Sequence, residues 1–265
     1  MERFLYRLSK SEHAVHFILK GALMLRAWKS PEIRPTKDID MLGITSNDVD
    51  DICKQVSDII SLEQEDGLVF SAESIRGEVI KEDADYEGVR VRFICTLENA
   101  RIPMQIDIGF GDIVYPEALQ VELPTVLDLP APVLPCYSRE SAIAEKFEAM
   151  IKLGELNSRM KDFYDIWLLS RQFVFNGDEL LEAVKLTFKN RGTALPDEIT
   201  AFNPLFVENT HIQWNAFHGR LKQDNLSKDF SSIVSDIQKL LLPVIDVVRS
   251  DKKINMIWNP GKGWQ

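Results

Sequence analysis

Cysteine is scarce in this sequence: the 265 residues include three, Cys53, Cys95 and Cys136, which lie far apart and form no CxxC pair. This scarcity argues against a zinc knuckle and a disulfide framework and favours a reducing cytosol. Apolar runs of membrane-spanning length are also lacking, and residues 1–17 lack the apolar stretch that follows a basic start in an export signal. We therefore expect a cytoplasmic protein with no membrane partner.

Positive charge is in deficit, because 31 Lys and Arg residues face 41 Asp and Glu residues, a formal net charge of −10. Such a balance disfavours non-specific nucleic-acid binding, which draws on positive charge over a whole surface. Any contact with RNA must therefore come from local basic clusters, each of which is more often simply a solvated face. The clusters are Arg26, Lys29, Arg34 and Lys37; Arg90, Arg92 and Arg101; and Lys152, Arg159 and Lys161.

Low-complexity tracts and internal repeats are missing too, and the shares of hydrophobic (45%) and charged (27%) residues are those of ordinary globular proteins. A chain of this length can bury a substantial core as two modest lobes. The patterns predict strand, turn, helix, loop and strand over residues 16–43 and a helix over residues 49–60. Between residues 70 and 110 they predict short strands, including 89–94 and 104–110.

The second half of the sequence has a different pattern. Five prolines between residues 116 and 136 exclude long helices and suggest a strap or interdomain linker. Helical spacing follows over residues 138–153 and 163–169, and again near 178–189 and 230–249, whereas residues 190–228 look irregular. We therefore predict an α+β protein with one domain at residues 1–135 and a helical domain at residues 136–265.

Three aspartates carry the strongest chemical signal. Asp38 and Asp40 stand two residues apart in an apolar predicted strand, so their carboxylates point to the same face, and Asp107 alternates with Ile106 and Ile108 in a later strand. Neighbouring carboxylates repel each other unless a cation lies between them, and the hard cations Mg²⁺ and Mn²⁺ prefer carboxylate oxygens. An isolated DxD pair is usually a solvated turn. The glycine turn at Gly21 and the third acid favour a two-metal site.

Four segments resemble motifs of the AbiEii family, the abortive-infection and toxin branch of the polymerase-β-like nucleotidyltransferases. Residues 19–22 and 34–40, which hold Gly21 and the Asp38-Ile39-Asp40 triplet, together resemble the first motif of that family. Residues 105–112 are similar to its third-acid strand. Residues 144–150 and 157–165 resemble its lysine and KDxxD motifs. The similarity spans about residues 15–170.

The resemblance implies a polymerase-β-like nucleotidyltransferase domain with a mixed β-sheet and flanking helices, followed by a mostly helical C-terminal lobe. It implies metal-dependent transfer of a nucleotide from an NTP. In characterised relatives the acceptor is the end of tRNA, so that translation is inhibited, and a toxin of this kind implies a cognate antitoxin as a partner.

The resemblance also assigns roles to individual residues. Asp38 and Asp40 would hold the metals that bridge the triphosphate, and Asp107 would bind the metal nearest the acceptor hydroxyl. Lys146, placed across a cleft in the helical lobe, would stabilise charge on the phosphates, and Asp162 would orient that lysine or contact the nucleotide. The ordinary alternatives are a surface lysine paired with neighbouring glutamates and an aspartate that caps a helix.

Further contacts with the nucleotide are expected around these motifs. The superfamily usually has Gly-Gly or Gly-Ser where this sequence has Gly21-Ala22, so a side-chain donor to phosphate is lost, although backbone N–H groups there can still bind an anion. The remaining nucleotide-binding candidates are Lys20, Gly21, Ala22, Thr36, Lys37, Arg159, Lys161 and Asp165.

Three other functions use similar residues. An aminoglycoside-type nucleotidyltransferase shares the DxD site and differs in its acceptor pocket. A catalytically silent nucleotide-binding module would keep the fold, but all three acids are present here. A metal-dependent hydrolase fits less well, because no histidine lies near Asp38 to act as ligand or base.

Overall fold

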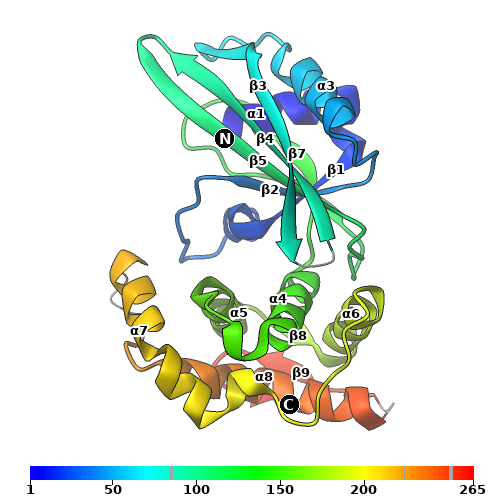
Figure 1. The fold of residues 1–265 in the computed structure, drawn as a ribbon, viewed down its shortest axis with the longest axis vertical. Helices are drawn as coiled ribbons and strands as arrows, with labels where there is room; N and C mark the ends of the chain where they lie inside the picture. Colours follow the sequence, from blue (N-terminus) through cyan, green and yellow to red (C-terminus); the bar gives the residue numbers. More distant parts are fainter. Residues whose placement is uncertain (84–85, 222, 224, 251–252) are drawn as a thin grey trace. The chain divides into compact units, whose positions relative to one another are not determined.

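A computed structural model describes residues 1–83, 86–221, 223, 225–250 and 253–265 (Figure 1). The chain forms two compact units. Unit 1 comprises Met1–Asp112 and Ala118–Tyr137, and unit 2 comprises Ile113–Glu117 and Ser138–Gln265. In the described part of the chain, no helix combines the length and apolar composition needed to cross a membrane.

Unit 1 is built on a seven-stranded mixed sheet with the strand order β3-β4-β5-β2-β1-β7-β6. The β2–β5 and β1–β7 pairs are parallel and the other neighbours are antiparallel. The strands are β1 (Phe17–Lys20), β2 (Ile39–Gly43), β3 (Leu68–Asp83), β4 (Tyr86–Leu97), β5 (Ala100–Phe110), β6 (Leu119–Glu122) and β7 (Val133–Cys136).

One face of this sheet is covered by the helices α1 (Glu2–Lys10) and α3 (Val49–Ile60). Successive side chains of a strand point to opposite faces, so every second residue of β4 points towards these helices. Val89, Val91 and Phe93 of β4 are buried, and the Phe93 ring lies 5.6 Å from the ring of Phe4 on α1. Asp48 caps α3, because its carboxylate accepts hydrogen bonds from two backbone N–H groups of the first turn. The alternate residues of β4 and β5 point to the opposite face, which carries the acids.

Two expectations about unit 1 need correction. The strands between residues 68 and 110 are long, with 16, 12 and 11 residues, because Gly and charged residues there continue along a sheet rather than end it. The proline-rich stretch is more than a strap, since β7 pairs with β1 and β6 adds the edge strand next to β7.

A buried ion pair ties α1 to the loop before β3. Arg7 donates to both carboxylate oxygens of Asp66, at 2.6 and 3.0 Å, and Arg3 donates to it at 3.0 Å. The Asp66 side chain is only 1% exposed. Burial alone would raise the pKa of Asp66, but the hydrogen bonds from Arg7 and Arg3 outweigh it and lower that pKa to about 2.

Replacing Asp66 by Asn should lower the free energy of unfolding at pH 7 by about 3 kcal/mol, because two arginines lose their buried partner. The folded-state pKa is depressed below that of the unfolded chain, so the carboxylate contributes its full stability above about pH 4 and loses it as the pH falls towards 2. Urea unfolding of both proteins at a series of pH values measures this. A stability gap that stayed constant down to pH 2 would contradict it.

Unit 2 is mainly helical. It contains α4 (Arg139–Leu153), α5 (Met160–Gln172), α6 (Gly177–Asn190), α7 (Pro204–Leu221) and α8 (Phe230–Ser250), with a small sheet of β8 (Phe175–Asn176), β9 (Ile257–Asn259) and β10 (Gly263–Trp264). Aromatic rings hold α5, α7 and α8 together: the Phe230 ring lies 5.1 Å from Phe163 and 5.0 Å from Trp214.

The expectation of irregular structure over residues 190–228 is wrong for α7. This helix buries only a narrow stripe, Phe206, Thr210 and Trp214, spaced four residues apart, and exposes Leu205 and Ile212 on its other sides. Because apolar residues of α7 lie on several sides of the helix, its sequence shows little of the amphipathic periodicity by which a helix is predicted. Residues 178–189 and 230–249, which do show such a face, are helical as expected.

Candidate active site

The three aspartates converge on the face of the unit 1 sheet that is opposite α1 and α3. Parallel pairing of β2 with β5 places Asp40 directly opposite Asp107, and Asp38 precedes Asp40 by two residues. One carboxylate oxygen from each of the three lies within 4.8 Å of the others. Asp107 is buried, whereas Asp38 and Asp40 are half-buried. The sheet thus gathers three anionic ligands from two segments that are far apart in the chain.

Gly21 allows the chain to turn tightly beside this cluster. It follows Lys20 at the end of β1, opposite Asp40, and has a φ of +74°. A β-carbon at this position would overlap the Asp40 carboxylate. Glycine is required here for two reasons, since the left-handed backbone disfavours other residues and the acid needs the space.

Replacing Gly21 by Ala should reduce catalytic turnover by about a hundredfold, because a displacement of Asp40 by about 1 Å is enough for a loss of that size. Gly261→Ala is the matched control: Gly261 has the same φ of +74°, but a β-carbon there would meet no atom within 4 Å. Turnover and melting temperature should be measured for both variants. Equal losses of turnover would show that backbone strain, rather than the Asp40 contact, matters.

Arg90 holds Asp107 in place. Cross-strand pairing sets Arg90 of β4 opposite Asp107, and its guanidinium donates to both carboxylate oxygens at 2.7 and 2.6 Å. The side-chain amide of Gln105 donates to one of them at 3.2 Å. The hydrogen bonds of Arg90 with Asp107 raise the pKa of Arg90 more than partial burial lowers it, so the residue remains cationic. Asp107 is therefore oriented by a bidentate contact with a permanent positive charge.

Lys20 lies in the same cross-strand row as Asp40 and is itself buried. Its ammonium group lies 3.1 Å from a carboxylate oxygen of Asp112, which follows the end of β5. The sequence assigns Lys20 to the nucleotide. In the structure its charge is balanced by Asp112, so this ion pair links β1 to the segment after the third acid.

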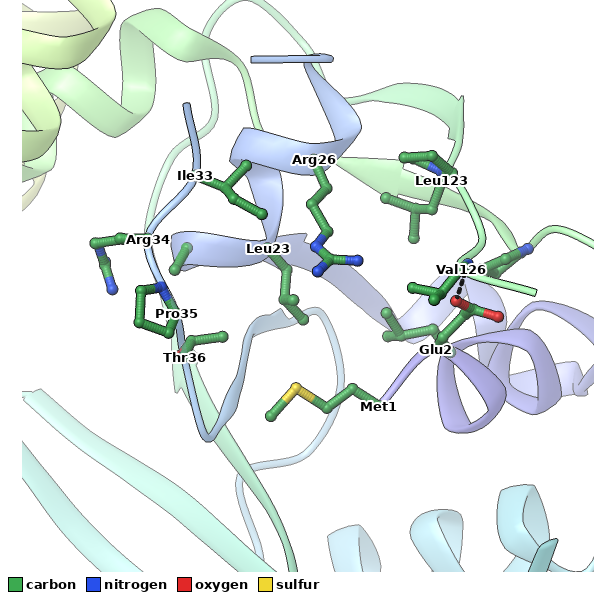
Figure 2. A pocket seen from close by; sticks show the side chains of 14 residues that line it. Met1, Glu2, Leu23, Arg26, Ile33, Arg34, Pro35, Thr36, Leu123 and Val126 are labelled. Atoms are coloured by element: carbon green, nitrogen blue, oxygen red, sulfur yellow. Dashed lines mark hydrogen bonds between the residues drawn. The ribbon is translucent and has the colours of Figure 1, made fainter. Parts of the chain in front are cut away.

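The loop before β2 adds a cavity to this region. Thr36 donates a hydrogen bond from its hydroxyl to the Asp38 carboxylate. On its other side the loop lines a cavity of about 530 Å³, with apolar walls that include Leu23, Ile33 and Leu123. Figure 2 shows the Arg26 side chain extending from α2 (Met24–Ala27) into this space. Lys37, another nucleotide candidate, is exposed.

In unit 2 the predicted lysine and both motif aspartates form one cluster. Lys146 of α4 lies 3.2 Å from Asp162 and 2.9 Å from Asp165, which are one turn apart on α5. Both aspartates are buried and the lysine is partly exposed. Arg159 directly precedes α5, and Lys161 is exposed on its first turn. The structure thus joins Lys146 to Asp165 as closely as to Asp162.

Comparison with known proteins decides the family. The profile of the family "Nucleotidyl transferase AbiEii toxin, Type IV TA system" matches residues 3–236. The chain belongs to the AbiEii family.

Solved structures agree with this AbiEii assignment at the level of the fold. JHP933 from Helicobacter pylori has a TM-score of 0.50 and 13% sequence identity, over 94% of this chain and 90% of that one. A candidate nucleotidyltransferase from H. pylori has the same score and identity, over 94% of both chains. Among curated proteins no sequence matches significantly. This AbiEii protein is thus a nucleotidyltransferase with a polymerase-β-like fold.

The acid cluster of this AbiEii protein suits a hard divalent cation. Three carboxylates face one another, and oxygen ligands of this kind are those that Mg²⁺ and Mn²⁺ prefer. Arg90 compensates the charge of Asp107 by donating to both of its carboxylate oxygens. A cation among the three oxygens would offset the repulsion between the remaining charges of Asp38 and Asp40.

Sequence reasoning missed the role of Arg90, which it placed only in a basic cluster. The alternation of Arg90 with Val89 and Val91 shows that Arg90 points to the polar face of the strand, but it does not show which residue Arg90 contacts. The partner depends on the register between β4 and β5, which the turn at residues 98–99 sets and which no local pattern reveals.

Proposed function

We propose that this AbiEii nucleotidyltransferase moves a nucleoside monophosphate from an NTP to the 3′ end of tRNA with the help of Mg²⁺ or Mn²⁺. The convergence of Asp38, Asp40 and Asp107 on one sheet face carries this proposal. The acceptor oxygen forms a bond to the α-phosphorus, the bond to pyrophosphate breaks, and the hydroxyl proton passes to solvent. Bound metal ions would neutralise the triphosphate and lower the pKa of the hydroxyl.

Each candidate site residue has its own role in this proposal. Asp38 and Asp40 would hold the metals, and Asp107, which Arg90 orients, would bind the metal nearest the acceptor hydroxyl. Backbone N–H groups at Gly21 and Ala22 and the exposed Lys37 contact the phosphates. Lys146 adds a point charge to the phosphates. Its ion pairs with Asp162 and Asp165 support this role by fixing where the ammonium group lies.

Although the protein is acidic overall, its local basic residues would bind the tRNA. Arg26, Lys29 and Arg34 belong to the segment that leads into the DxD strand, and Arg159 and Lys161 to the start of α5. Modification of the 3′ end would stop aminoacylation and so inhibit translation, which is the expected action of a toxin. A cognate antitoxin and a cytoplasmic location form part of this proposal.

A small-molecule acceptor is the second candidate. The cavity beside Thr36 favours it, because 530 Å³ falls within the range of pockets that enclose small ligands. Its wall shares a hydrogen bond with Asp38, so that a ligand there would lie near the metal-binding acids.

One experiment separates the two acceptors. The protein is incubated with Mg²⁺, each α-labelled NTP in turn, and either total tRNA or a panel of aminoglycosides. We expect label on tRNA with one or a few nucleotides and none on the aminoglycosides. Label on an aminoglycoside alone would replace tRNA by a small molecule, and no label on either would reject both acceptors.

A further inference from the structure

Charged side chains form a continuous row across the face of the sheet that carries the acids. Residues directly opposite on neighbouring strands point to the same face. The register pairs Glu78 with Arg90, Arg90 with Asp107, Asp107 with Asp40, and Asp40 with Lys20. The acid cluster is therefore flanked on its β4 side by an arginine rather than by an apolar residue.

More arginines follow on the same face, farther from the acids. In the next row Arg76 of β3, Arg92 of β4 and Gln105 of β5 stand opposite one another. Near the far end of the hairpin Arg101 pairs with Thr96. We call Arg76, Arg90, Arg92 and Arg101 the arginine face.

Arg90 is explained by its contact with Asp107, but stability does not explain the other three residues of the arginine face. Arg76 and Arg92 are like charges directly opposite each other, an arrangement that destabilises a sheet. Arg76 donates only to the nearby exposed backbone carbonyls of Glu73 and Ile75, at 2.9 and 2.6 Å, and these local contacts do not offset the repulsion. Arg92 has an ion pair with Glu78 at 2.7 Å, but both side chains are 51% exposed, and such a pair contributes little. On the part of the hairpin beyond Asp107, the exposed Arg76, Arg92 and Arg101 outnumber Glu78, and this local excess of positive charge on a protein with a net charge of −10 points to an anionic partner.

We propose that the arginine face binds the sugar–phosphate backbone of the acceptor RNA and leads its 3′ end to Asp107. This inference rests on the proposed function and extends it by naming where the acceptor lies. From Arg101 to Asp107 the strand β5 covers about 20 Å, at about 3.3 Å per residue. The face is thus long enough for several nucleotides of a single strand.

The side chains suit a single strand in two ways. The planar guanidinium of Arg binds phosphate through two hydrogen bonds, and it also stacks on bases. Ile94 and Pro103 lie opposite each other between Arg101 and Arg92 on the same face, with Pro103 exposed. They offer an apolar surface for an unstacked base between two phosphate contacts.

The test replaces Arg76, Arg92 and Arg101 together by Gln and leaves Arg90, which orients Asp107, in place. The control replaces Lys10, Lys54 and Lys189 by Gln, three exposed cations on α1, α3 and α6. Both variants change the charge by the same amount. Filter binding of labelled total tRNA at a series of salt concentrations, binding of a fluorescent NTP analogue, and melting temperature are measured for all proteins.

We expect the arginine variant to bind tRNA at least about tenfold more weakly and its log–log salt slope to fall by about 2, since each lost contact to single-stranded RNA removes about 0.7. NTP binding and melting temperature should match the control. Equal tRNA binding and slope in both variants would overturn the proposal, as would loss of binding to anionic phospholipid vesicles with tRNA binding unchanged. The binding measurements test the arginine face independently of nucleotide transfer. A wild-type protein that labels no RNA would reject the proposed function, whereas the salt slopes of tRNA binding would still test the arginine face.

Discussion

Nucleotide transfer by an Asp40→Asn variant should be at least about a thousandfold slower than by the wild type, with an unchanged fold. Asn keeps the size of the side chain but removes the charge that a divalent cation requires. A bound cation contributes several kcal/mol to such a reaction, and each 1.36 kcal/mol corresponds to a factor of ten in rate. Single-turnover rates with α-labelled NTP, together with Mn²⁺ binding measured by calorimetry, give the comparison.

Asp51→Asn is the control for this variant. Asp51 is exposed on α3, which covers the opposite face of the sheet, so its replacement changes the net charge equally without touching the acids. It should transfer label at the wild-type rate. Wild-type transfer by Asp40→Asn, or normal Mn²⁺ binding by that variant, would show that Asp40 is not a metal ligand.

The second large effect is expected at Lys146. Lys146→Ala should lower turnover by at least about a hundredfold, the usual loss when one preorganised donor to a developing charge is removed. Asp162 and Asp165 lose their shared partner as well, so the variant should also be less stable. Turnover must therefore be measured well below the melting temperature of the variant.

A neighbouring ion pair on the same helix separates the two effects. Glu148 of α4 is fully buried and accepts from Arg191 at 2.8 Å. Glu148→Gln weakens this pair, and with it unit 2, without changing Lys146. We expect it to lower the melting temperature but to leave turnover within a few fold. If both variants lost turnover in proportion to their stability, Lys146 would be a structural residue.

Local sequence patterns were sufficient to predict the candidate site residues that lie within short segments. The i, i+2 spacing of Asp38 and Asp40, the alternation around Asp107 and the glycine at position 21 all follow from short segments. That Asp107 meets them depends on β5 pairing with β2 rather than with β1. No local pattern in the sequence reveals this strand order.

The partners of these residues could not be predicted in the same way. The hydrogen bonds of Arg90 to Asp107, the ion pair of Lys20 with Asp112 and the arginine face all depend on register between strands distant in sequence. Register is set by the whole sheet, because a shift by one residue reverses every side chain. Local sequence patterns therefore could not predict such contacts, whereas they could predict the three acids.

The central claim is that this AbiEii protein transfers a nucleoside monophosphate through the acid cluster of Asp38, Asp40 and Asp107. Its most direct test supplies NTP labelled either at the α- or at the γ-phosphate, with Mg²⁺ and total tRNA, to wild type and Asp40→Asn. The account predicts that wild type places the α-label on tRNA and releases the γ-label as pyrophosphate, and that Asp40→Asn does neither. Transfer of the γ-label to tRNA, or equal α-label transfer by both proteins, would contradict it.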